Sequence, residues 1–208
     1  MSGEILMATN NPHKTERFKY YLNELGLTIV SYADIKKKVE VIEDGKTPEE
    51  NALKKAKAGH DATGMTTFGV DYWFFIEGIP DEIQPGPYVR RIFTGKKGAR
   101  KEATDEEMLD YYTKLIADLG GKTKGLWRSA IAMVTRAGKS YADSSTRDTV
   151  LTSVRSPNET RGEPLNSVQI DPKSGKYFTD MTKEEWLRLQ SERERGYIRF
   201  FESHLDEL

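Results

Sequence analysis

Near its N-terminus the chain reads Ile5-Leu6-Met7-Ala8-Thr9-Asn10-Asn11-Pro12-His13-Lys14. This pattern predicts a short apolar strand that runs into a polar turn and opens a helix. Backbone N–H groups and small polar side chains at a helix N-terminus favour an anion, and Lys14 adds a mobile charge that can follow a phosphate. The Gly-x-x-x-x-Gly-Lys spacing of a Walker A loop is missing. An ordinary N-capped helix explains the same turn equally well.

The composition limits the classes of protein to which the chain can belong. Its 208 residues suffice for one domain with a substantial core. The net charge is −1, from 32 basic and 33 acidic residues, so the chain has no overall positive charge that would attract nucleic acid. The absence of Cys excludes disulfides, a thiolate nucleophile and Cys-ligated zinc. Any phosphate ligand must therefore be met by local charges.

The chain shows no targeting signal that we recognise. Met1-Ser2-Gly3-Glu4 lacks the basic region and long apolar run of a signal peptide. No segment approaches the length needed to span a bilayer. We therefore expect a cytoplasmic protein that does not engage a membrane.

Strand and helix signals alternate along the chain, which predicts a mixed α/β single domain over residues 1–208. Three capping boxes, each opened by a Thr, predict helices that begin near Thr47, Thr104 and Thr182. The first of these helices is expected to stop at Gly59. Strands are expected at residues 27–32 and 66–76, in a hairpin of 129–135 with 139–141, and separately at 146–154. Residues 79–87 and 155–176 are rich in turn formers and are expected to be mainly loop.

Two further groups of residues bear on chemistry. Glu43-Asp44-Gly45 precedes the capped helix that carries Asn51 and Lys55, four residues apart on one helical face. A carboxylate beside a tight turn can ligate a hard cation, and Lys55 can reach the phosphates of the same ligand. The alternative is that these residues form an ordinary surface turn and an ordinary surface lysine, without a role in binding.

Asp71 interrupts an apolar, aromatic run, where a carboxylate is costly to bury without a partner. We expect it at the exposed end of its strand, where polar groups of α/β sheets line ligand crevices. The other interpretation is that Asp71 lies within the strand on its solvent-facing side, since side chains alternate between the two faces of a strand. The neighbouring aromatics, Tyr72 among them, are more typical of a core than of a stacking platform for nucleic acid.

In order along the chain, these segments resemble the inosine triphosphate pyrophosphatase family, whose enzymes hydrolyse aberrant purine nucleoside triphosphates to monophosphate and pyrophosphate. The resemblance covers the first 91 residues most specifically. It rests on Thr9-Asn10-Asn11-Pro12-His13-Lys14, Glu43-Asp44-Gly45, Thr47-Pro48-Glu49-Glu50-Asn51-Ala52-Leu53-Lys54-Lys55-Ala56, Asp71 and Pro85-Gly86-Pro87-Tyr88-Val89-Arg90-Arg91.

The resemblance implies a two-lobed α/β fold, a long mixed sheet flanked by helices with a cleft between the lobes, and a homodimer. It implies that Glu43 binds Mg²⁺ and that Asp71 is a metal ligand or the base that activates water. Lys14 and Lys55 would act in catalysis as well as in binding. The substrate-binding residues that it implies are Thr9, Asn10, Asn11, Lys14, Lys55, Arg91, Asn166 and Arg195. We add Tyr72, the aromatic residue next to Asp71, to this predicted substrate-binding set.

The sequence also departs from the family pattern. The usual acidic pair followed by small residues reads Val70-Asp71-Tyr72-Trp73, so one carboxylate is missing. The aromatic-Asp-Pro loop that clasps the base is not reproduced near 161–167, although Asn166 can take the Asp position. In place of the Ser-His-Arg motif that reads a 6-keto purine stands Arg193-Glu194-Arg195-Gly196, which retains one Arg.

We therefore predict a nucleoside triphosphate pyrophosphatase that uses Mg²⁺ and whose base preference differs from inosine or xanthosine, because Glu accepts a hydrogen bond where His can donate one. Two alternatives remain. One is a nucleotide-binding protein of the same fold that has lost or altered hydrolysis. The other is a related transferase or biosynthetic enzyme that uses the triphosphate site for another leaving group.

Overall fold

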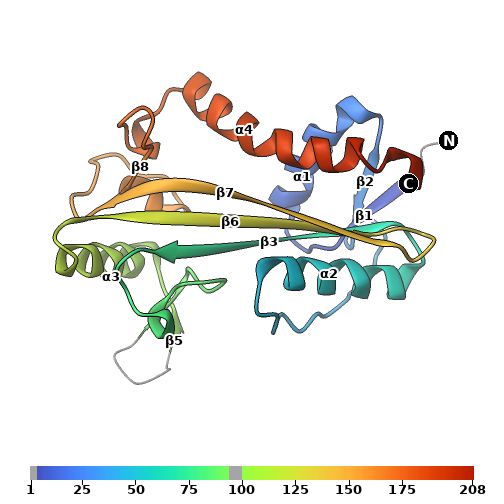
Figure 1. The fold of residues 1–208 in the computed structure, drawn as a ribbon, viewed down its shortest axis with the longest axis horizontal. Coiled ribbons are helices and arrows are strands. Elements are labelled where there is room, and N and C mark those ends of the chain that lie inside the picture. The colour runs from blue at the N-terminus through green and yellow to red at the C-terminus, as the bar shows by residue number, and fades with distance from the viewer. Residues whose placement is uncertain (1–3, 94–99) are drawn as a thin grey trace. The chain divides into compact units, whose positions relative to one another are not determined.

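The computed structural model describes residues 4–93 and 100–208. Its centre is a six-stranded sheet in the order β2-β1-β3-β6-β7-β8 (Figure 1). Strand β1 pairs in parallel with both β2 and β3, and β7 pairs antiparallel with β8. The strands are β1 (Glu4–Met7), β2 (Thr28–Ser31), β3 (Thr67–Ile76), β6 (Lys122–Val134), β7 (Ser140–Thr152) and β8 (Gln169–Ile170). This mixed sheet, flanked by helices, confirms the predicted fold class.

The chain forms two compact units, and strands β3, β6 and β7 contribute residues to both. The first unit holds the described residues up to Asp71, together with Ser129–Ser145 and Gln190–Leu208. The second holds the described residues of Tyr72–Arg128, together with Thr146–Leu189.

The first unit contains α1 (Pro12–Leu22), α2 (Pro48–Thr63) and the C-terminal part of α4 (Lys183–Glu202). Its core is aromatic. The ring of Phe18 on α1 lies 5.3 Å from that of Phe68 on β3 and 5.0 Å from that of Tyr197 on α4. Phe68 and Phe201 meet edge to face at 5.1 Å. These contacts fix α1 and α4 against the strand that carries Asp71.

Helix α2 starts where the sequence predicts and ends later. The Thr47 hydroxyl accepts the Glu50 N–H at 3.2 Å, as expected of the N-cap. The predicted capping box is not closed, because the Glu50 carboxylate accepts the Lys46 N–H at 2.7 Å and not the Thr47 N–H. The prediction that Gly59 stops the helix is wrong, because α2 runs on to Thr63 and ends at Gly64, whose φ is +69°. Gly59 instead allows close packing: a Cβ there would lie 2.7 Å from Thr67 Cγ2 and 2.9 Å from the Tyr32 hydroxyl.

The second unit contains α3 (Asp105–Asp118), the hairpin of β4 (Arg91–Phe93) with β5 (Arg100–Glu102), and the N-terminal part of α4. The capping box predicted at Thr104 is present, with reciprocal bonds to Glu107. The rings of Phe74 and Trp127 stack at 4.4 Å in a core to which α3 contributes. The capping box at Thr182 likewise opens α4.

The predicted hairpin is present, but its strands are longer than the sequence indicates. Residues 139–141 and 146–154 were expected to form separate strands, whereas Ser140–Thr152 is one continuous strand. The polar interior of this strand, including Asp143 and Ser144, is exposed, so it carries none of the apolar alternation by which a strand is recognised. The loop predicted at 155–176 contains the short 3₁₀ helix Pro164–Ser167 and strand β8.

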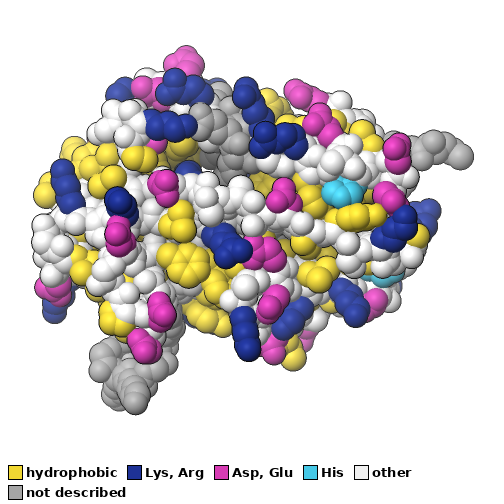
Figure 2. Space-filling view, viewed as in Figure 1, with side chains coloured by type: hydrophobic (Ala, Val, Ile, Leu, Met, Phe, Trp, Pro, Cys, Tyr) yellow, Lys and Arg dark blue, Asp and Glu magenta, His cyan; other side chains and the backbone are white. Residues whose placement is uncertain are grey.

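Basic and acidic side chains are interspersed over the face drawn in Figure 2. Among the described residues, no helix is long and apolar enough to cross a membrane. Residues 1–3, on which the expectation about a signal peptide partly rests, lie outside the described part of the chain.

Candidate active site

The polar turn after β1 is organised by its own side chains. The Thr9 hydroxyl accepts the Asn11 N–H, and Asn11 Oδ1 accepts the Lys14 N–H, both at 3.1 Å. Asn11 is thus the N-cap of α1, and Pro12 follows at the first helical position. The two interpretations of this turn are therefore compatible: a capped helix is present, and its N-terminus lies beside Asn10 and Lys14, which line a cavity.

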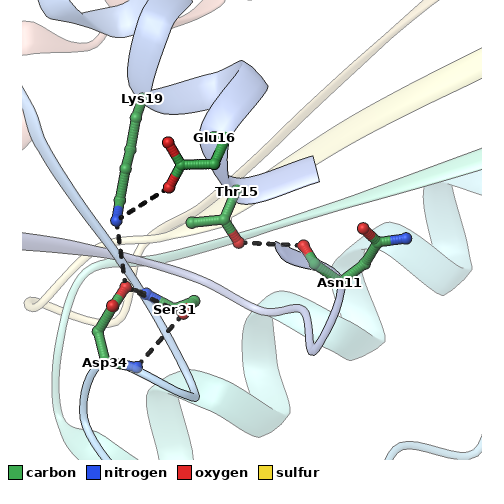
Figure 3. A network of polar contacts seen from close by, with 6 residues as sticks. All are labelled: Asn11, Thr15, Glu16, Lys19, Ser31 and Asp34. Atoms are coloured by element: carbon green, nitrogen blue, oxygen red, sulfur yellow. Dashed lines mark hydrogen bonds and ion pairs between the residues drawn. The ribbon is translucent and has the colours of Figure 1, made fainter. Parts of the chain in front are cut away.

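Figure 3 shows how α1 is fixed to the end of β2. Asp34 Oδ2 accepts the Ser31 N–H at 2.8 Å and the Ser31 hydroxyl at 3.0 Å, and it lies 3.4 Å from Lys19 Nζ on α1. The Ser31 backbone N–H, followed by the Ser31 hydroxyl, lowers the pKa of the Asp34 carboxyl below its usual value. In the same view, and separate from these contacts, the Thr15 hydroxyl donates to Asn11 O at 3.2 Å.

A cavity of about 470 Å³ opens beside this turn, entirely within the first unit. It is bounded by the end of β1, the first turn of α1, the irregular segment 39–43, α2 and β3. Its lining residues are Ala8, Thr9, Asn10, Lys14, Tyr32, Val39, Glu40, Val41, Glu43, Lys55 and Val70. A space of this size is typical of a small-molecule site.

Two carboxylates converge on one ammonium group at the wall of the cavity. Lys55 Nζ lies 2.8 Å from Glu43 Oε2 and 2.7 Å from Asp71 Oδ1. The side chains of Lys55 and Asp71 are only 13 % and 8 % exposed, whereas Glu43 is 46 % exposed. Asp71 is therefore buried and paired rather than solvent-facing, as a carboxylate in an apolar strand requires. The expectation that it lies at the exposed end of its strand is wrong, because Asp71 lies inside β3.

This donor set fits a hard divalent cation. Oxygens from Glu43 and Asp71 already surround a single positive charge, so the two carboxylates can share a cation. Among the described residues, no group of three His, Cys, Asp or Glu side chains is placed to hold a metal. Mg²⁺ suits such a site, because it is commonly bound by one or two carboxylates and completes its coordination with waters and substrate phosphates.

Most of the residues predicted to hold a triphosphate lie together in the first unit. Thr9, Asn10, Lys14, Glu43 and Lys55 line the cavity, and Asp71 contacts Lys55. Asn11 contributes its Oδ1 to the helix cap.

The remaining predicted residues are not among those that line the cavity. Tyr72, Arg91 and Asn166 belong to the second unit, and Arg195 is exposed on α4. Arg91 Nε lies 3.4 Å from Glu102, and its guanidinium lies 5.3 Å from the centre of the Tyr88 ring. Asn166 is buried, and its amide donates to Glu163 at 2.9 Å.

Sequence reasoning missed several lining residues. Val39, Glu40 and Val41 belong to a segment without helix or strand, so no periodic pattern singled them out. Tyr32 was placed in a strand and given no role. Burial raises the pKa of the Tyr32 phenol, whose oxygen has no hydrogen-bonding partner among the described residues.

Comparison with known proteins gives the family. The sequence model of the Ham1 family matches residues 5–200. The chain belongs to the Ham1 family. It is 31 % identical over 186 residues to a dITP/XTP pyrophosphatase of Thermoanaerobacter sp. (strain X514), covering 88 % of this chain and 87 % of that protein. It is 29 % identical over 187 residues to a dITP/XTP pyrophosphatase of Thermus thermophilus, covering 89 % of this chain and 84 % of that protein. These matches confirm the resemblance drawn from the motifs.

Solved structures of Ham1 proteins share the fold. The Staphylococcus aureus Ham1 protein superposes with a TM-score of 0.75 at 22 % identity, covering 98 % of each chain. A HAM1 protein from Coxiella burnetii superposes with a TM-score of 0.78 at 17 % identity, covering 99 % of each chain. The likeness of fold extends over nearly the whole chain.

Proposed function

We propose that this Ham1 protein is a nucleoside triphosphate pyrophosphatase, which hydrolyses purine ribo- or deoxyribonucleoside triphosphates to the monophosphate and pyrophosphate with Mg²⁺. The observation that carries the proposal is the contact of Lys55 Nζ with both Glu43 and Asp71 beside a cavity that Lys14 also lines. Relatives named dITP/XTP pyrophosphatase, of similar length, support the same reaction.

Phosphoryl chemistry explains this set of side chains. Water attacks the α-phosphorus, the bond from that phosphorus to the bridging oxygen breaks, and pyrophosphate leaves with the bonding electron pair. Lys14 and Lys55 neutralise charge on the phosphate oxygens, where it must be balanced in the transition state. Glu43 and Asp71 would hold Mg²⁺, which supplies Lewis-acid stabilisation of the phosphate chain. Asp71 also has the chemistry of the base that accepts the proton of the attacking water.

The protein groups alone provide little positive charge for a polyphosphate. Lys14 and Lys55 are offset by Glu40 and Glu43 on the cavity wall and by Asp71 beside it. A triphosphate therefore needs the divalent ion to balance its charge at this site. We expect turnover to require Mg²⁺ and to stop when the ion is chelated.

We further propose that the base preference differs from inosine and xanthosine, because the Ser-His-Arg motif is replaced by Arg193-Glu194-Arg195. The side chains of Arg193 and Glu194 are outside the described part of the structure. By resemblance to the family, we also propose a homodimer in the cytoplasm, which light scattering of the purified protein and imaging of a tagged chain would test.

The decisive experiment is a screen of standard, deaminated and modified nucleoside triphosphates with detection of pyrophosphate, with and without Mg²⁺. We expect pyrophosphate and monophosphate in equal amounts, only with the metal. Release of orthophosphate instead would contradict the proposed bond cleavage. Hydrolysis of inosine triphosphate far above every other nucleotide would contradict the altered base preference and leave the reaction class intact.

One observation favours a second candidate, a nucleotide-binding protein without hydrolysis. Val70 lies on the cavity wall where the resembled family has the first carboxylate of its acidic pair. Calorimetry that shows tight triphosphate binding, combined with no pyrophosphate release over hours, would select this alternative.

A further inference from the structure

The buried amide of Asn51 joins the two segments that carry the carboxylates. Asn51 lies in α2 and has no exposed surface. Its Oδ1 accepts the Gly45 N–H at 2.8 Å, and its Nδ2 donates to Asp71 Oδ2 at 3.3 Å. Gly45 is two residues beyond Glu43, so one amide group contacts both the Glu43 segment and the part of β3 that carries Asp71.

We propose that Asn51 is a positioning residue that sets the separation of the Glu43 and Asp71 carboxylates and thereby the affinity of the site for a divalent cation. This inference rests on the proposed function, because it assigns a cation to those two side chains. Asn51 acts through the two carboxylates and contacts neither cation nor substrate itself.

The chemistry of the amide suits this role. An Asn side chain accepts through its oxygen and donates through its nitrogen, so it satisfies a backbone N–H and a carboxylate at once. Its donation to Asp71 Oδ2 fixes one oxygen, while Asp71 Oδ1 is the atom that contacts Lys55. Asp71 is thus oriented with a defined oxygen toward the shared cation position. Residues that orient ligands in this way commonly change metal affinity when they are replaced.

The close approach of Gly45 to Asn51 supports the same role. A Cβ on residue 45 would lie 2.5 Å from Asn51 Oδ1 and 2.9 Å from Glu50 Cβ, so this position has no room for a side chain. Besides the ion pair of Lys55 with Glu43, two contacts hold the segment to α2: the Lys46 N–H donates to Glu50 at 2.7 Å, and Lys54 pairs with Asp44. These two join the segment to α2 alone, whereas the Asn51 amide, like the Lys55 ammonium group, also contacts Asp71.

The test uses the nucleotide-free full-length protein and Mn²⁺ as the probe, with free Mn²⁺ measured by electron paramagnetic resonance. Mn²⁺ prefers the same carboxylate and water ligands as Mg²⁺. We expect Asn51→Leu to weaken Mn²⁺ binding about 10- to 100-fold, the range for loss of a residue that orients a metal ligand. The Mg²⁺ concentration for half-maximal pyrophosphate release should rise in parallel.

Gly45→Ala disturbs the same hydrogen bond from the loop side and also serves if Asn51→Leu does not fold. It should weaken Mn²⁺ binding as well. Because Asn51→Leu already removes the hydrogen bond that Gly45→Ala disturbs, the double variant should bind Mn²⁺ no more weakly than the weaker single variant. Full additivity would overturn the shared role of the two residues.

Gln169→Leu is the matched control. Gln169 is a buried amide in the second unit that accepts the Trp127 Nε1–H at 2.7 Å. Its loss should lower the melting temperature and leave Mn²⁺ affinity unchanged. The inference fails if the Asn51 and Gly45 variants, like this control, lose thermal stability but keep wild-type Mn²⁺ affinity. The proposed function fails separately, if the wild-type protein releases no pyrophosphate.

Discussion

Lys55 and Asp71, sixteen residues apart in the chain, form a nearly buried ion pair with Nζ 2.7 Å from Oδ1. The same ammonium group lies 2.8 Å from Glu43, so it occupies the point at which the two carboxylates converge. Without a nucleotide, Lys55 thus balances the negative charge that a divalent cation would otherwise balance. A cation that binds there must compete with the ammonium group, which is then available to a phosphate.

This arrangement makes a prediction for Lys55→Met. Removal of the ammonium group should strengthen Mn²⁺ binding to the nucleotide-free protein, because both carboxylates lose their competing partner. It should also lower kcat/KM about 10²- to 10³-fold, since one positive charge on the phosphate chain is lost. Mn²⁺ titration and steady-state pyrophosphate release measure the two effects.

Lys57→Met provides the control, because it removes the same charge from an exposed position of the same helix. It should change neither measurement more than about twofold, as expected of a solvent-screened surface charge. Weaker Mn²⁺ binding in Lys55→Met would contradict the competition and would mean that Lys55 is needed to hold the carboxylates together.

Asp71→Asn tests the other partner. The amide keeps the shape of the side chain but can neither accept a proton from water nor offer a full charge to a metal. We expect kcat to fall about 10²- to 10⁴-fold, the usual contribution of a general base. The far-ultraviolet circular dichroism should match that of the wild type, which would show that the fold is intact. An unchanged kcat would remove Asp71 from the mechanism.

Those parts of the site that depend on local sequence signals could be predicted from the sequence. The turn at Thr9–Lys14 and the capped start of α2 are short-range patterns, and both are present. Asn51 and Lys55 were placed on one face of a helix by their spacing of four residues, and both indeed contact Asp71. Local periodicity and capping therefore fix the direction in which these side chains point.

The parts that were missed depend on contacts between distant segments. The interpretation of Gly59 as a helix end was wrong, because the sequence does not distinguish a glycine that ends a helix from one that allows another segment to pack closely. Val39 to Val41 line the cavity from an irregular segment that has no periodic pattern. The approach of Asn51 to Gly45 likewise depends on the path of the loop, which no motif defines.

Close packing of α2 on β3 gives a prediction about stability. A Cβ on Gly69 would clash with the backbone oxygen of Ala52 and lie 2.7 Å from Lys55 Cβ. Gly69→Ala should therefore lower the free energy of unfolding by about 1–3 kcal/mol, as overpacking does. It should also lower activity, because the displaced backbone carries Lys55.

Gly196→Ala is the matched comparison on α4. Apart from its chain neighbours and the backbone of α4 itself, no described atom lies within 4 Å of the Cβ that the change would add. A helical glycine that becomes alanine with room to spare should raise the free energy of unfolding by about 0.5–1 kcal/mol. Denaturant unfolding measures both variants, and equal effects of the two changes would contradict the packing argument.

The network of Figure 3 predicts how stability depends on pH. The Ser31 N–H and hydroxyl lower the folded-state pKa of Asp34 below its usual value of 3.8. A carboxyl with a lowered pKa stabilises the fold above the unfolded-state pKa, and this stabilisation is lost as the pH falls through the folded-state pKa. Asp34→Asn should therefore be less stable than the wild type near neutral pH, and the difference should disappear in acid.

The difference in the free energy of unfolding is about 1 kcal/mol or less, because the Asp34 side chain is 42 % exposed and solvent screens it. Ser31→Ala, which removes the hydroxyl donor and keeps the Ser31 N–H, should show a smaller difference over the same pH range. Denaturant unfolding from about pH 2 to about pH 7 tests this, and curves for wild type and Asp34→Asn that stay parallel throughout would show that the carboxylate's charge contributes nothing here.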